Sequence, residues 1–235
     1  MASNMLTPNI KGILLARKYA YDILRRFFIE EPSKEYLRIF FGKKMHHQFP
    51  FKEEDKDIAE GISDISDYMN EFDPVKNEAD FEDLHWDYTR MMVGPYLLPA
   101  PPWESVYVRE DKLLFQETTL KVRKKYRKYG FTANELHIEA EDHIGLELDF
   151  MYHLNNLLLK MAGGEEQFNS EGIKEILTEQ NSFLREHLLA FAPEFANKVI
   201  ENADTLFYQG MAKMMKGFLQ TDSKVLHELL DIENF

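Results

Sequence analysis

Apolar side chains recur along most of this chain at spacings of three and four residues, which is the period of one face of an α-helix. Two of these series are Ile13, Ala16, Ala20, Ile23 and Phe27, and Ile58, Ile62, Ile65, Met69 and Phe72. No stretch shows the alternation of apolar and polar residues, bounded by hairpin turns, that indicates β-strands. The sequence therefore predicts an all-α fold.

Glycine and proline residues divide this pattern into segments. The predicted helical ranges are 13–27, 34–41, 58–72, 81–91, 120–129, 143–161, 173–188, a helix that begins at Pro193, and 206–218, with a short last turn at 225–230. Hydrophobic residues make up 44% of the chain, which is enough for an ordinary buried core. We expect a single bundle of about nine helices that forms one domain over residues 1–235.

A proline-rich segment, residues 95–108, interrupts the helical pattern in the middle of the chain. Its prolines are Pro95, Pro99, Pro101 and Pro102. We interpret the segment as an ordered loop or a hinge, and loops of this length in compact proteins commonly carry function. The aromatic side chains of Trp103 and Tyr107 favour either a contact surface or a loop that is pinned to the core.

The net charge of the chain indicates which kinds of partner it can bind. The chain has 28 Lys and Arg against 41 Asp and Glu, a net charge of −13. Such an acidic surface repels nucleic acids and anionic lipids, and it favours cationic peptides, although solubility alone also explains it. The basic run at 121–128 is therefore interpreted as a solvated helix face. We expect no nucleic-acid partner.

Several classes of site are excluded by what the sequence lacks. There is no cysteine, which excludes disulfides, thiolate metal sites and cysteine nucleophiles. No glycine-rich phosphate loop or nucleophile elbow occurs. Residues 1–10 do not have the pattern of a signal peptide, and no run approaches the ~18 apolar residues of a membrane helix. We expect a cytoplasmic protein that has no cofactor and does not insert stably into a membrane.

The densest group of polar residues runs from Glu139 to Glu147 and includes Asp142 and His143. Three interpretations compete for it. A carboxylate that orients a histidine is the core of general-base catalysis. The same residue types bind metal ions, and together with Glu82 and His85 they would make a metal-dependent helical enzyme. Asp142 also suits the N-cap of the following helix.

Four motifs in order resemble the TorD/DmsD/NarJ-like family of redox-enzyme maturation chaperones. They are Tyr88-x-x-Met91-Met92-x-Gly94-Pro95; Pro101-Pro102-Trp103-Glu104-Ser105-Val106-Tyr107; Glu139-Ala140-Glu141-Asp142-His143 at the start of a long helix; and Phe183-Leu184-x-x-His187-Leu188, followed by Phe207-Tyr208 and Phe218-Leu219. The resemblance covers roughly residues 10–222, and the order and spacing make it more specific than any one motif. Two departures are Met91-Met92 in place of Leu-Phe and Ala140 in place of proline.

The resemblance implies an all-helical chaperone that is not an enzyme. Members bind the twin-arginine leader of a molybdenum-containing oxidoreductase and hold the precursor back from export until its cofactor is loaded. A monomer is expected, or a homodimer in which the proline-rich segment lets two chains exchange helices.

The resemblance also implies a binding site for the leader peptide, with no catalytic residue and no metal. The residues that we expect there are Tyr88, Met91, Met92, Pro102, Trp103, Ser105, Tyr107, Glu139, Asp142 and His143. Asp142 and Glu139 would bind the arginines through charge-assisted hydrogen bonds, and His143 would add another. The aromatic and apolar members would line a groove for the apolar stretch that follows the arginines.

Overall fold

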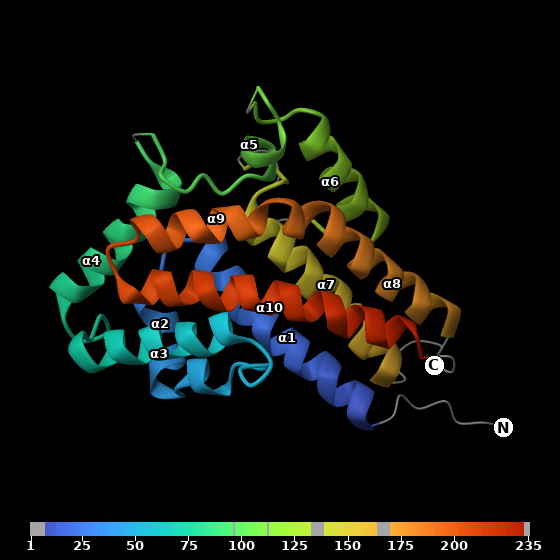
Figure 1. Ribbon diagram of the computed structural model, residues 1–235, viewed down its shortest axis with the longest axis horizontal. Coiled ribbons are helices and arrows are strands. Elements are labelled where there is room, and N and C mark those ends of the chain that lie inside the picture. The colour runs from blue at the N-terminus through green and yellow to red at the C-terminus, as the bar shows by residue number, and fades with distance from the viewer. Residues whose placement is uncertain (1–7, 96, 112, 133–138, 164–169, 233–235) are drawn as a thin grey trace.

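A computed structural model describes residues 8–95, 97–111, 113–132, 139–163 and 170–232 of the chain, and these are mostly helical (Figure 1). The helices are α1 (Pro8–Ile29), α2 (Lys34–Gly42), α3 (Lys56–Glu71), α4 (Glu78–Tyr88), α5 (Glu104–Val108), α6 (Glu117–Lys128), α7 (Ile144–Gly163), α8 (Ser170–Phe183), α9 (Leu189–Asn202) and α10 (Leu206–Leu230). A 3₁₀ turn η1 (Met45–Gln48) and two π-helical turns, η2 (Thr89–Val93) and η3 (Leu184–Leu188), complete them. Within these ranges no β-strand occurs, so the predicted all-α fold is confirmed. The π turn η3 joins α8 to α9 without a break, so these two count as one helix. The prediction of about nine helices is therefore also confirmed for the described residues.

The long C-terminal helix α10 is the centre of the bundle. It packs along α3 on one side and along α9 on another, while α1 packs along α7 (Figure 1). The face of α10 that looks into the bundle is fully buried, including Met211, Met214 and Phe218. The rings of Phe27 and Phe207 meet edge to face at 5.1 Å between centroids, which joins α1 to the start of α10.

The crossing of α3 and α10 depends on two glycines. A Cβ atom on Gly210 would lie 2.6 Å from the carbonyl oxygen of Gly61, and a Cβ on Gly61 would collide with the carbonyl oxygen of Gly210. Any larger residue at either position would therefore push the two helices apart, because close-packed backbone cannot yield as a flexible side chain does. The two glycines explain why α10 and α3 approach so closely.

A buried polar network ties α1 to α7 and α10. The guanidinium of Arg17 forms two bonds to the carboxylate of Asp222, with Nε–Oδ1 at 2.5 Å and Nη2–Oδ2 at 3.0 Å. It also donates to Oδ1 of Asn155 at 2.9 Å, and the Tyr21 hydroxyl donates to Asp222 at 2.7 Å. Arg17 and Asp222 are both fully buried, so the network replaces the water that these charges lose on folding.

Three details differ from the sequence-based expectations. The last turn predicted at 225–230 is not separate, because α10 runs unbroken from Leu206 to Leu230. Pro193 does not begin a helix, because it lies inside α9, which continues from the π turn η3. The proline-rich segment was expected to contain no helix, but its last part forms the short helix α5. Tyr96 in the same segment lies outside the described residues. In the part of the chain that the structure describes, no helix is long and apolar enough to cross a membrane.

Candidate functional site

The proline-rich segment is joined to the start of α7 by a short backbone pairing. Trp103 and His143 form an isolated antiparallel bridge. The N–H of Glu104 donates to the carbonyl of Asp142 at 2.9 Å, and the N–H of Ile144 donates to the carbonyl of Pro102 at 2.7 Å. We call residues 102–105 and 139–144 together the loop–helix joint. The second and third family motifs therefore meet in space, as the predicted site requires.

The carboxylate of Asp142 is fully buried at the centre of this joint. It accepts hydrogen bonds from the backbone N–H of Ser105 at 3.0 Å and from the hydroxyl of Thr119 on α6 at 2.9 Å. The acceptor at the start of α7 is instead Nδ1 of His143, which receives the N–H of Gly145 at 3.1 Å. The expectation that Asp142 caps α7 is thus wrong, because its oxygens bind the loop and α6.

The imidazole of His143 is buried between the joint and α7. Burial lowers the pKa of His143 from about 6.5 to about 4, so the ring is neutral at physiological pH. With Nδ1 accepting from Gly145, the ring proton is on Nε2. The ring packs edge to face against Trp103, with 6.1 Å between centroids. These contacts give His143 a packing and capping role at the joint.

Three of the predicted residues are half-buried and reach the surface, namely Trp103, Glu139 and Tyr107. The indole N–H of Trp103 donates to Oε1 of Glu139 at 2.6 Å. The hydroxyl of Tyr107 donates to the carbonyl of Pro101 at 2.8 Å, and Nζ of Lys198 lies 4.5 Å from the centre of its ring. An aromatic ring and a carboxylate are therefore held side by side at the edge of the joint.

The other predicted residues lie beneath this edge. Tyr88, Met91, Met92, Pro102 and Ser105 are all buried. The N–H of Ala100 donates to the carbonyl of Met91 at 3.3 Å, which ties the proline-rich segment to η2. Burial raises the pKa of Tyr88 well above its usual value, and the charges of nearby acidic residues, Glu139 among them, add to the shift. The first motif thus lies close to the joint, where it forms core packing.

The joint is also held from the side of α6. The guanidinium of Arg123 binds both carboxylate oxygens of Glu141, at 2.5 and 2.9 Å. The buried hydroxyl of Tyr126 donates to the carbonyl of Glu141 at 2.9 Å. The basic face of α6, which the sequence suggested is only solvated, therefore supplies at least one cation that fixes the residues before α7.

One buried polar group was missed by the sequence reasoning. It consists of Glu104 on α5, Glu147 on α7 and His187 in η3. Nδ1 of His187 lies 3.0 Å from Oε2 of Glu104. A signal was present in the sequence, since Glu147 falls on the same helix face as Ile144 and Met151 and so had to be buried.

The residues of the alternative metal enzyme are not assembled. Nε2 of His85 lies 2.8 Å from Oε2 of Glu31 at the surface, and Glu82 is exposed beside it on α4. Glu139 and Asp142 bind Trp103 and Ser105 as described above. Among the residues that the structure describes, Glu104, Glu147 and His187 form the group that is able to hold a metal ion.

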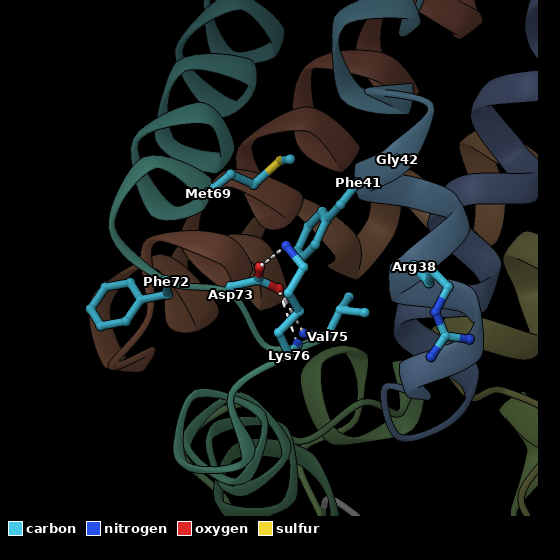
Figure 2. Close-up of a pocket in the computed structure, with 8 residues that line it drawn as sticks. All are labelled: Arg38, Phe41, Gly42, Met69, Phe72, Asp73, Val75 and Lys76. Carbon is cyan, nitrogen blue, oxygen red and sulfur yellow. Dashed lines mark hydrogen bonds and ion pairs between the residues drawn. The ribbon is translucent and has the colours of Figure 1, made fainter.

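A surface pocket of about 330 Å³ lies away from the joint, between α2 and the end of α3 (Figure 2). Its lining residues are Arg38, Phe41, Gly42, Met69, Phe72, Asp73, Val75 and Lys76. The carboxylate of Asp73 is already bound by Lys76, with Nζ–Oδ2 at 3.0 Å and the backbone N–H at 3.1 Å from Oδ1. The pocket contains none of the predicted site residues.

Comparison with known proteins gives consistent matches. The model of the nitrate reductase delta subunit family matches residues 51–197. The chaperone protein TorD of Aliivibrio salmonicida is 28% identical over 211 residues, which covers 89% of this chain and 94% of that protein. TorD of Vibrio vulnificus strain CMCP6 is 26% identical over 221 residues, with 94% and 99% covered. The Tat proofreading chaperone DmsD of Salmonella typhi is 30% identical over 135 residues, with 57% and 58% covered.

Proposed function

This chain belongs to the nitrate reductase delta subunit family, to which the TorD and DmsD chaperones are related, and we propose that it is a redox-enzyme maturation chaperone and not an enzyme. Its partner in this proposal is the twin-arginine leader of a molybdenum-containing oxidoreductase. The chaperone acts in the cytoplasm, where it binds the leader before the precursor is exported.

The observation that carries the leader-binding proposal is the pairing of Trp103 with Glu139 at the edge of the loop–helix joint. Arginine forms bidentate, charge-assisted bonds with carboxylates and stacks on aromatic rings. A half-buried carboxylate next to an indole ring suits one arginine of the leader. The net charge of −13 adds a long-range attraction for such a cationic peptide.

The remaining predicted residues divide into two roles. Asp142, Ser105 and His143 position the joint, because the Asp142 carboxylate accepts the backbone N–H of Ser105 and Nδ1 of His143 accepts the N–H of Gly145. Tyr88, Met91, Met92, Pro102 and Tyr107 supply the apolar surface for the stretch that follows the arginines, and the leader reaches the buried members when the proline-rich segment shifts away from η2. The weak 3.3 Å bond from Ala100 to Met91 is the contact that this movement breaks.

Calorimetric titration of the full-length protein with a leader peptide tests the proposal. We expect Glu139→Gln to weaken binding by about 1–3 kcal/mol, since a bond to a charged group is lost. Replacing the two leader arginines by lysines should weaken binding as well, because lysine cannot form the bidentate contact. Binding should also weaken as salt is added.

Asp67→Asn is the matched control, because Asp67 is an exposed acid on α3. Its affinity for the leader should equal that of the wild type. If the leader does not bind, the proposed partner is wrong. If it binds and Glu139→Gln and Trp103→Phe leave the affinity unchanged, the partner stands and the assigned site is wrong.

A further inference from the structure

Three buried side chains from separate elements converge inside the bundle, and they lie outside the half-buried edge described above. They are Glu104 on α5, Glu147 on α7 and His187 in η3, and one potential ligand atom from each lies within 4.8 Å of the other two. We propose that this cluster binds one divalent first-row transition-metal ion. The inference stands whether or not the chain binds a leader peptide.

The first argument is the charge that the protein encloses. Glu104, Glu147 and His187 are 3%, 0% and 5% exposed, so water cannot stabilise two carboxylates there. The buried carboxyl group of Asp142 adds a further acid nearby. A buried carboxyl group keeps its proton unless a counter-charge is present, and a divalent cation would let both acids of the cluster ionise and bind it.

The second argument is an unsatisfied group. Among the described residues, neither carboxylate oxygen of Glu147 has a hydrogen-bond partner, although the side chain is completely buried. Most buried polar atoms in folded proteins are paired, and an orphaned one indicates an ion or a water that belongs there. Glu104 differs, because one of its oxygens lies 3.0 Å from Nδ1 of His187. Glu147 thus offers two free oxygens to an ion.

The ligand types narrow the choice of ion. Carboxylate oxygens alone suit Mg²⁺ and Ca²⁺, whereas imidazole nitrogen suits zinc, iron and related metals. A set of two carboxylates and one imidazole therefore favours Zn²⁺, Fe²⁺ or Mn²⁺. Because the cluster is enclosed on all sides by protein, the ion would act as a structural clamp and not as a reaction centre.

The backbone around the cluster explains what such a clamp would hold. His187 lies in the π turn η3, and single π turns within helices frequently mark functional sites. Glu104 begins the five-residue helix α5, which is the last part of the proline-rich segment. An ion bound by Glu104, Glu147 and His187 would fix α5 between α7 and η3, and so would stiffen the end of the proline-rich segment.

Metal titration of the full-length protein tests the inference. Protein stripped with a chelator is titrated with Mn²⁺, Zn²⁺ or anaerobic Fe²⁺, with Mg²⁺ for comparison, and bound metal is measured by elemental analysis after desalting. We expect one ion per chain, no retained Mg²⁺, and a rise in Tm of roughly 5–10 °C at a metal concentration about 100-fold above Kd. Failure to retain any of the three metals would overturn the site.

Variants separate this site from surface binding. Glu147→Gln keeps the shape of the side chain and removes its charge, so the metal-free protein should fold and its metal affinity should fall about 100-fold or more. Asp149→Asn, at a half-buried acid on the same helix, should bind metal as the wild type does. Glu104→Gln serves as a second test. Wild-type affinity in both glutamine variants, or an equal loss in Asp149→Asn, would contradict the assignment.

Discussion

The backbone N–H of Ser105 donates to the carboxylate of Asp142 at 3.0 Å in a fully buried position, although the two residues are 37 apart in the chain. This bond fixes the end of the proline-rich segment to the start of α7. It also brings α6 into the same joint, because the second Asp142 oxygen accepts the hydroxyl of Thr119 at 2.9 Å. One carboxylate therefore organises three parts of the chain.

Asp142→Ala should lower the free energy of unfolding by about 2–4 kcal/mol, because it leaves the Ser105 N–H and the Thr119 hydroxyl buried without partners. Asp142→Asn should cost less, since the amide oxygen still accepts one of the two bonds. Urea denaturation measures both values. The exposed control Asp67→Ala should change stability by no more than ~0.5 kcal/mol. A loss for Asp142→Ala as small as that of the control would refute this role.

The helices of this fold can be predicted from the spacing of apolar residues along the chain. The contacts of the loop–helix joint cannot be predicted in this way. The period of apolar residues predicts α1, α3 and α10 because each helix buries one continuous face. The partner of a single carboxylate, in contrast, is set by which loop arrives beside it. From the sequence, Asp142 suits a helix cap or an arginine ligand, whereas in the structure its two oxygens accept hydrogen bonds from the loop and from α6.

The burial of His143 predicts a specific pH dependence. The pKa of His143 is about 4 in the folded chain and about 6.5 in the unfolded chain, so only the unfolded chain takes up this proton between those values. The contribution of His143 to stability is therefore complete above pH 6.5 and is lost as the pH falls toward 4. Between pH 7 and 4.5 the wild type should lose about 2–3 kcal/mol more than His143→Gln.

Chemical denaturation at a series of pH values measures this difference. The comparison between wild type and His143→Gln isolates one group, because His46, whose pKa burial lowers in the same way, is present in both proteins. Parallel stability curves for the two proteins would show that His143 is not held neutral by burial.

Arg17 and Asp222 should show strong energetic coupling. Arg17→Met leaves the buried Asp222 carboxylate without its cation and should cost about 3–5 kcal/mol. The double variant Arg17→Met, Asp222→Leu should cost clearly less than the sum of the single variants, since it removes both charges. The exposed pair Lys121–Glu117 on α6 is the control, and its single variants should have little effect. Additive losses in the Arg17–Asp222 cycle would contradict the coupling.

The predicted site residues differ in their exposure. The second and third motifs meet at the joint and the first lies close to it, yet Tyr88, Met91 and Met92 are core residues. Aromatic and apolar side chains suit both a peptide groove and a buried core, so residue type alone does not distinguish the two. Glu147 gives the converse case, because an acid on an apolar helix face marks a buried polar cluster whose partners come from distant elements.

The last prediction concerns the two glycines at which α3 and α10 cross. Gly61→Ala and Gly210→Ala should each lower the free energy of unfolding by about 1–3 kcal/mol, because the added Cβ meets the carbonyl oxygen of the opposite glycine and the helices must separate. Gly12→Ala on α1 is the matched control. Nothing lies within 4 Å of a Cβ at that exposed position, so alanine should stabilise the helix by about 0.5–1 kcal/mol. The urea concentration at the unfolding midpoint of each of the three variants, compared with the wild type, tests this prediction. A higher midpoint for Gly61→Ala would show that α3 and α10 do not meet at these glycines.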